Sequence, residues 1–247
     1  MRRRKNALKN SCSILARSKR NTLTWKKSGR RKKLHCRVKP RLKVISKKPG
    51  SISTLRAGHS VTVSSARGDS AATVARETGA RAAASNREAA AGADVVVFAV
   101  PYGAVWDVLD EIGPALAGKV VVDATNPLKP DNSGLATEGT SGAEQIQARV
   151  PEARVVKAFN TAFAARQADP TIAGVKVDGF VAADDDDARG VVLALVESMG
   201  FHPIDAGPLQ MARALEALAF LNMSLQMRHA WSWQSGWKLV GPEGDAS

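Results

Sequence analysis

ADVVVFAVP, residues 93–101, holds six consecutive apolar residues between an aspartate and a proline. A strand with one face in water alternates apolar and polar residues, whereas an unbroken β-branched run is typical of a strand covered on both faces of a parallel sheet. Two similar runs follow, GKVVVDATNPL at 118–128 and ARVVKAFNT at 153–161. Helical patterns separate these runs. The sequence therefore predicts an α/β fold, a Rossmann-like doubly wound parallel sheet with right-handed crossovers.

The charge of the chain is unevenly distributed. Residues 1–58 contain 21 of the 36 Lys and Arg residues and no Asp or Glu, while the remaining residues carry a net charge of −8. A segment so basic and polar buries too little apolar surface to offset its conformational entropy. We therefore predict three parts: a basic arm of low order over 1–51, an incomplete Rossmann-type NADP-binding domain over 52–205, and a C-terminal helical segment over 206–247.

The arm also bears on partners and location. Its cations would bind nucleic acid only non-specifically, because no recognition motif accompanies them. No apolar run approaches the roughly 18 residues that cross a bilayer, so we expect no membrane partner. The two cysteines, Cys12 and Cys36, lack metal-type spacing and favour a reducing, cytoplasmic setting. An organellar transit peptide of basic, acid-poor composition remains an alternative.

RAGHSVTVSSARG, residues 56–68, has the pattern of a helix end followed by the second strand of a dinucleotide-binding unit. A G-x-G-x-x-G loop that holds the pyrophosphate is expected about 15–20 residues upstream. The chain has no glycine between Gly29 and Gly50. Residues 42–46 could mimic a first strand, but too few residues then remain for a loop and a full helix.

We therefore predict that the first βα unit is missing or has been replaced by the arm. A shifted reading frame or a mistaken start would produce the abrupt change of composition near residue 50. Without that unit an apolar sheet edge would be exposed, and the helix N-terminus that binds pyrophosphate would be absent. NADP binding is then expected to be weak or absent.

Ligands of open parallel sheets bind beyond the carboxyl ends of the strands. After the second strand stand Ser65 and Arg67, whose hydroxyl and cation favour the 2′-phosphate of NADP over the ribose hydroxyls of NAD. Pro101 and Tyr102 lie where a nicotinamide would be reached, and Asn126 could bond its carboxamide. The alternatives are a solvated turn for the arginine, strand termination and packing for the Pro-Tyr pair, and an Asx-turn for the asparagine.

No Ser-His-Asp arrangement, zinc spacing or Walker loop occurs in the sequence, so we predict neither a catalytic side chain nor a metal site. The acidic run at 184–187 suits a helix start, where capping and the macrodipole favour carboxylates. This absence fits hydride transfer, in which the cofactor carries the reaction and the protein orients the reactants.

Five stretches in order resemble the NADPH-dependent reductases of coenzyme F420, the deazaflavin cofactor. They are the three runs quoted first, AGHSVTVSSARG at 57–68 and FHPIDAGPLQMARALEALA at 201–219. The resemblance covers about residues 52–242. It implies a Rossmann-type domain with a small C-terminal helical part, usually a homodimer, that moves hydride between nicotinamide C4 and deazaflavin C5. The absent glycine loop is the departure from that family.

The resemblance also implies roles for individual residues. Ser65 and Arg67 would contact the 2′-phosphate. The nicotinamide would be lined by Val100, Pro101, Tyr102, Asn126 and Pro127. The second substrate would lie near Asn160, Thr161, Gly207, Pro208, Leu209 and Gln210.

Two other functions remain open. One is an NADPH-dependent imine or carbonyl reductase that resembles pyrroline-5-carboxylate reductase, which also pairs a Rossmann unit with C-terminal helices. The other is a non-catalytic protein whose basic arm binds nucleic acid. The first prediction remains an NADP(H)-linked oxidoreductase that uses coenzyme F420 or a related acceptor.

Overall fold

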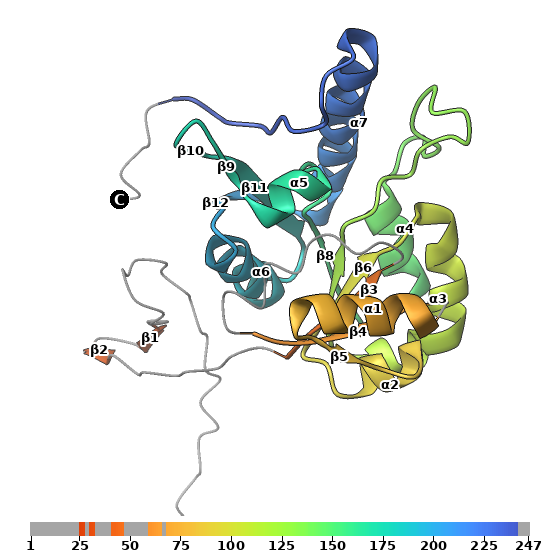
Figure 1. Cartoon of the computed structure of the whole chain (residues 1–247). Coiled ribbons are helices and arrows are strands. Elements are labelled where there is room, and N and C mark those ends of the chain that lie inside the picture. Colours follow the sequence, from red (N-terminus) through yellow and green to blue (C-terminus); the bar gives the residue numbers. More distant parts are fainter. Residues whose placement is uncertain (1–24, 28–29, 33–40, 47–58, 66–67, 242–247) are drawn as a thin grey trace, which may run out of the picture. The chain divides into compact units, whose positions relative to one another are not determined.

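The computed structural model describes residues 25–27, 30–32, 41–46, 59–65 and 68–241. The chain divides into two compact units, Met1–Val38 and Lys39–Ser247. In the first unit the described residues form an antiparallel hairpin, β1 (Trp25–Lys27) paired with β2 (Arg30–Lys32). The second unit contains the α/β fold (Figure 1).

An eight-stranded sheet lies at the centre of the second unit. Six neighbouring strands are parallel, and the first of them in the chain lies in the middle, as in dinucleotide-binding folds. The predicted Rossmann-like fold is therefore confirmed. From one edge to the other the strands are β5 (Arg81–Ala82), β4 (Ser60–Ser64), β3 (Arg41–Ser46), β6 (Val95–Ala99), β7 (Val120–Asp123), β8 (Arg154–Ala158), β11 (Asp178–Ala183) and β12 (His202–Gly207).

The middle of this sheet is occupied, contrary to our expectation. β3 comes from the basic arm and pairs in parallel with β4, from Arg41 opposite Ser60 to Ile45 opposite Ser64. It also pairs in parallel with β6 on its other side. The prediction of an exposed apolar edge is therefore wrong, because five residue pairs on each side satisfy the backbone of β3. The expected phosphate loop and first helix fall on residues 47–58, outside the described residues.

The sheet is not parallel throughout. β11 is antiparallel to β8, and β12 is parallel to β11. A parallel return from β8 would need a helix long enough to recross the sheet. The connection instead carries the five-residue α5 (Ala164–Ala168) and a small hairpin, β9 (Thr171–Ile172) with β10 (Val175–Lys176). Five helical residues span only about 7.5 Å, so the chain turns back antiparallel.

Side-chain caps fix the starts of two helices. Ser85 and Ser141 each accept a hydrogen bond from the backbone N–H of a glutamate three residues later, which fixes two helix starts. The longer helices are α1 (Gly68–Thr78), α2 (Asn86–Ala91), α3 (Val105–Ile112), α4 (Gly142–Arg149), α6 (Asp186–Ser198) and α7 (Ala212–His229). The 3₁₀ turns are η2 (Tyr102–Ala104), η3 (Gly113–Leu116) and η4 (Leu209–Met211).

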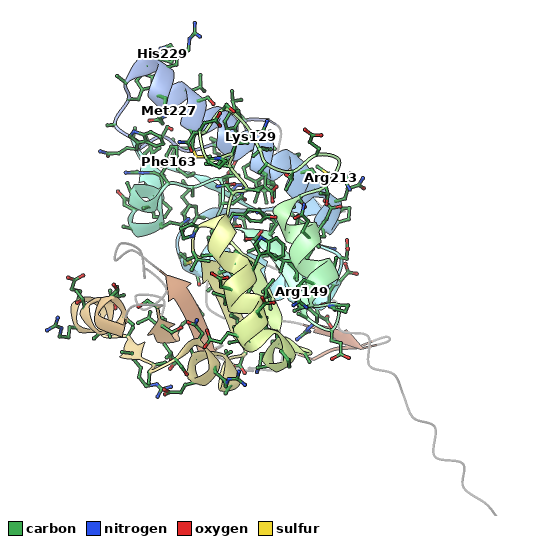
Figure 2. The ribbon with its side chains drawn as sticks, turned by 90° about the vertical axis from the view of Figure 1, so that its right-hand side faces the viewer. Lys129, Arg149, Phe163, Arg213, Met227 and His229 are labelled. Carbon is green, nitrogen blue, oxygen red and sulfur yellow. The ribbon has the colours of Figure 1, made fainter. Side chains whose placement is uncertain are left out.

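The helix α7 completes the C-terminal part. Figure 2 labels Arg213 near its start and both Met227 and His229 near its end. In the described part of the chain, no helix has the length and apolar character needed to cross a membrane.

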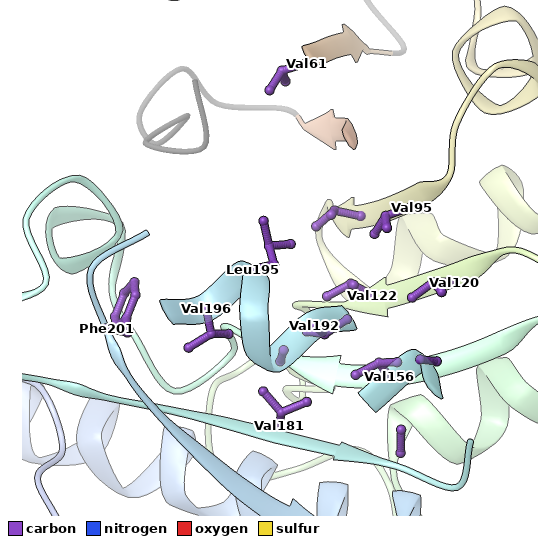
Figure 3. Close-up of a cluster of buried hydrophobic side chains, with 14 of the residues drawn as sticks. Val61, Val95, Val120, Val122, Val156, Val181, Val192, Leu195, Val196 and Phe201 are labelled. Atoms are coloured by element: carbon purple, nitrogen blue, oxygen red, sulfur yellow. The ribbon is translucent and has the colours of Figure 1, made fainter. Parts of the chain in front are cut away.

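The core has two layers, one on each face of the sheet. Val95 and Val97 of β6 belong to the cluster covered by α1 and α6, which Figure 3 shows around Val192 and Leu195. The alternate residue Phe98 belongs to the opposite cluster, covered by α2, α3 and α4. Both faces of β6 are thus buried, which explains why its sequence is apolar without alternation.

Candidate functional site

The candidate site lies at the edge of the sheet where the parallel strands end. β4 leads to Ser65, β6 to Val100, β7 to Asn126 and β8 to Asn160. Because β6, β7 and β8 are adjacent and parallel, three of these exits lie side by side. The structure therefore brings together the residues predicted to line the nicotinamide side. Arg67 lies outside the described residues.

Two asparagine side chains join the exits of β7 and β8. The amide of Asn126 donates to the backbone oxygen of Asn160 at 3.1 Å, and the amide of Asn160 donates to Asn126 Oδ1 at 3.0 Å. The same Asn160 amide reaches the Leu215 carbonyl of α7 at 3.0 Å. These side chains join two strand ends and a helix. An Asx-turn, the alternative for Asn126, would bond only to the nearby backbone.

The turn before Asn160 has an uncommon backbone. Phe159 has φ of 65°, in the left-handed region that a bulky residue rarely adopts. Its carbonyl accepts a hydrogen bond from Gln167 Nε2 at 3.1 Å, and the following Thr161 is buried. Backbone strain of this kind is concentrated at functional sites, where surrounding contacts hold it.

A group of three charged side chains lies beneath these exits, and we call it the buried ionic cluster: Asp123, Lys157 and Glu216. None of the three side chains is exposed. Lys157 Nζ donates to Asp123 Oδ2 at 2.8 Å, to Glu216 Oε1 at 2.8 Å and to the Thr125 carbonyl at 2.7 Å. Asp123 Oδ1 accepts the Thr125 N–H at 2.9 Å. The cluster therefore holds both backbone groups of the residue before Asn126.

Glu216 also faces the start of α4. The Gly142 N–H lies 3.0 Å from its Oε1 and 3.2 Å from its Oε2. Burial raises the pKa of the Glu216 carboxyl, and the charge of Lys157 opposes that rise. All of its recorded hydrogen-bond partners are donors, which suits a carboxylate and leaves no acceptor for a carboxylic acid proton.

Tyr102 packs against this cluster on the α4 side. Its hydroxyl donates to Gln145 Oε1 at 2.7 Å, and its ring meets Trp106 edge to face at 5.6 Å. Burial, with the charges of Glu216 and Asp123, raises its pKa to about 12. A Cβ at Gly142 would lie 2.9 Å from the tyrosine ring, so only glycine allows this approach.

Other predicted residues frame the same edge. Val100 is half-buried, Pro101 is exposed and begins the turn η2, and Pro127 is buried directly after Asn126. Three buried oxygens here have no hydrogen-bond partner in the part of the chain that the structure describes: Ser64 Oγ, Thr125 Oγ1 and Asn160 Oδ1. An unpartnered buried oxygen costs about 1–3 kcal/mol, so a ligand with N–H donors would relieve it. A primary carboxamide, as in nicotinamide, fits this requirement.

The turn from Gly207 to Gln210 starts level with Lys157 near the end of β8, because Gly207 and Lys157 both pair with Ala182 of β11. Because β12 runs antiparallel to β8, the chain leaves Gly207 toward the edge at which β8 begins. The Leu209 N–H binds Asp184 Oδ1 at 2.8 Å, and the leucine side chain is buried. The prediction of a fully parallel sheet is wrong for β11 and β12, while the role of this turn near the second substrate stays a prediction. With Pro208, this turn instead leads into α7.

Comparison with known proteins bears on this arrangement. Residues 51–127 match the family described as "NADP oxidoreductase coenzyme F420-dependent". Over these residues, the chain is similar to that family. The match includes the exits of β4, β6 and β7, up to Pro127.

Two curated proteins match a longer segment of the chain. The F420-dependent NADP reductase of Methanothermobacter thermautotrophicus is 35% identical over 150 residues, which cover 57% of this chain and 64% of that protein. The metalloreductase STEAP3 of Rattus norvegicus is 32% identical over 130 residues, 52% of this chain and 26% of that protein. The chain thus spans less than two thirds of these relatives.

A solved structure extends the similarity. A putative F420-dependent NADP reductase from an Arthrobacter species is 28% identical, with a TM-score of 0.70 over 82% of this chain and 100% of that one. An imine reductase from Myxococcus stipitatus, at 19% identity and a TM-score of 0.59, shares the fold. The similarity to F420-dependent NADP reductases agrees with the family resemblance of the sequence.

The buried ionic cluster is the part of the candidate site that sequence reasoning missed. A signal was present, because a charged residue interrupts each of two apolar strands near its end, Asp123 in VVVDA and Lys157 in VVKAF. Charges inside buried strands are almost always paired, so two opposite charges in adjacent runs indicate partners. Glu216, some sixty residues later, has no such local signal.

Proposed function

We propose that the chain is an NADP(H)-dependent oxidoreductase that moves hydride between nicotinamide and coenzyme F420 or a related acceptor. The observation that carries the proposal is the edge formed by the ends of β6, β7 and β8, where paired asparagines lie beside unpartnered buried oxygens. The bound nicotinamide supplies the chemistry, a hydride with its electron pair at ring carbon C4. The protein binds the two reactants, orients them and excludes water from the site.

Individual residues take the following roles in this proposal. Ser65 and Arg67 would hold the 2′-phosphate, and Thr125 with Asn160 would accept hydrogen bonds from the carboxamide. Asn126, Val100, Pro101, Tyr102 and Pro127 would frame the nicotinamide, and Thr161 would lie near the acceptor. For Gly207, Pro208, Leu209 and Gln210 a role near the acceptor would require an acceptor that reaches along the start of α7.

An imine is the second candidate acceptor. The buried ionic cluster contains two carboxylates and one ammonium, which gives a formal charge of −1 below the proposed site. This charge favours a cationic iminium over an anionic acceptor. Hydride transfer from NADPH to F420, followed at the absorption of each cofactor, and a parallel assay with a cyclic imine would distinguish them. Absence of NADPH binding would overturn both.

Because β3 fills the sheet, NADPH binding is expected to be measurable by calorimetry despite the missing glycine motif. Thr125→Val tests the carboxamide contact. The change keeps the shape of a buried side chain and removes a hydroxyl without a partner among the described residues. We expect NADPH to bind about five- to tenfold more weakly, with folding stability unchanged or slightly raised. Unchanged affinity would remove this residue from the site.

We further propose that the chain forms a homodimer through α7. This helix buries polar Glu216, Asn222 and Gln226, yet exposes Leu221 at 48% and Met227 at 51%. Exposed apolar side chains on one helix often mark an interface. The proposed setting is the cytoplasm, and the basic arm would bind nucleic acid only non-specifically.

The dimer can be tested by changing one exposed side chain. Leu221→Glu should convert a dimer to a monomer in sedimentation experiments, because a carboxylate would be buried without a partner at the interface. The matched control is Val175→Glu, which places the same charge on β10 at a residue of similar exposure, 51%. A wild-type monomer, or a variant that stays dimeric, would contradict this proposal.

A further inference from the structure

The buried ionic cluster contains two negative charges and only one positive charge. Lys157 faces two carboxylates, and its three N–H groups are already used by Asp123, Glu216 and the Thr125 carbonyl. Among the residues that the structure describes, the remaining hydrogen bonds to the two carboxylates come from the backbone N–H groups of Gly142 and Thr125. The start of α4 contributes a partial positive charge to Glu216, but a fixed formal charge of −1 remains.

This charge is neither screened by water nor far from the candidate site. The three side chains are completely buried, so solvent weakens their field little. Lys157 contacts the carbonyl of Thr125, which immediately precedes Asn126. At the end of β6, the charges of the same two carboxylates contribute to the raised pKa of Tyr102. The field of the cluster therefore acts on groups of both β6 and β7 exits.

The two redox forms of the nicotinamide ring differ in charge. The ring is cationic when oxidised and neutral when reduced, and an interior anion stabilises the cationic form. We propose that Glu216, through the excess charge of the buried ionic cluster, sets the preference of this site for NADP⁺ over NADPH and so favours the direction in which hydride leaves NADPH. This inference rests on the proposed function and deepens it, because it names the residue that sets the direction.

Glu216→Gln isolates the charge from the contacts. The amide oxygen of glutamine can still accept from Lys157 and from the Gly142 N–H, the two donors that lie near Oε1. The cluster then has one ammonium and one carboxylate. Glu152→Gln is the matched control, because it removes the same charge from an exposed side chain before β8, at the opposite edge of the sheet.

The measurement is the ratio of the dissociation constants for NADPH and NADP⁺, from titration of each form with wild type and both variants. We expect Glu216→Gln to shift this ratio toward NADPH by about fivefold, and Glu152→Gln to leave it unchanged. The equilibrium potential of the bound couple, obtained from the same ratio, should rise accordingly, because the oxidised form loses more binding free energy than the reduced form. If Glu216 had a purely structural role, the substitution would weaken the binding of NADPH and NADP⁺ equally.

Each outcome separates this inference from the proposed function. If wild type binds both forms and the ratio in Glu216→Gln equals that of wild type, the inference is wrong while the proposed function stands. If wild type binds neither form, the proposed function itself fails. Circular dichroism and thermal unfolding of the variant show whether the fold is intact, and a ratio measured on folded protein decides the question.

Discussion

Lys157→Met should lower the free energy of unfolding by about 3–5 kcal/mol, because it leaves buried charges without compensation. Methionine has a similar length and fills the space, so the loss isolates the electrostatic contribution. Asp123 and Glu216 would face each other with no cation between them, and the Thr125 carbonyl would lose its partner. Chemical denaturation measures this loss.

Two comparisons make the test specific. Lys176→Met changes an exposed lysine of β10 in the same way and should stay within about 0.5 kcal/mol of wild type. Adding Glu216→Gln to Lys157→Met should recover part of the stability, because one of the two uncompensated carboxylates becomes neutral. A loss below about 1 kcal/mol for Lys157→Met would show that the buried pairing contributes little.

The loss should also depend on pH. Without the lysine, the pKa of Glu216 lies further above that of the unfolded chain, since burial already raises it in wild type and the opposing charge of Lys157 is gone. A group with a raised folded pKa stabilises the fold below its unfolded pKa, and this contribution disappears as pH rises through the folded value. The deficit of Lys157→Met should therefore be smaller near pH 5 than near pH 8.

Gly179→Ala is expected to cost about 1–3 kcal/mol through overpacking of the core. Gly179 lies in β11, and a Cβ there would stand 3.2 Å from Phe201 Cβ and in direct overlap with Val196 Cγ1. Both neighbours are fully buried between β11, α6 and β12, so they cannot move into solvent. The melting temperature of a unit of this size should fall by about 2–12 °C, at about 2–4 °C for each kcal/mol.

Gly103→Ala is the matched control. No atom lies within 4 Å of its added Cβ, and its backbone is not left-handed. Its stability should change little or rise by a few tenths of a kcal/mol, because alanine restricts the unfolded chain. A Gly179→Ala protein as stable as this control would indicate that β11 and α6 can separate without cost.

Much of the fold was predictable from local pattern. The unbroken apolar runs at β6, β7 and β8 indicated burial on both faces, which the structure confirms. Strand direction has no such local signature, which is why the antiparallel course of β11 was missed. It depends on the short connection that precedes the strand.

The candidate site was predictable to a similar degree. Strand exits locate Asn126 and Asn160, since parallel strands end at one edge, but not the bond between their side chains. The cluster beneath them joins β7, β8 and α7, and α7 lies far along the chain from both strands. Its long-range pairing is set by tertiary packing, which no window of sequence contains.

β3 has a practical meaning for anyone who shortens this chain. The family match begins at residue 51, and a truncation designed from that match would discard Arg41–Ser46 together with the rest of the basic segment. Such a fragment would lack the strand that lies between β4 and β6, and both of these strands would lose a hydrogen-bonded neighbour. The second unit begins at Lys39, and a cut before that residue would spare it.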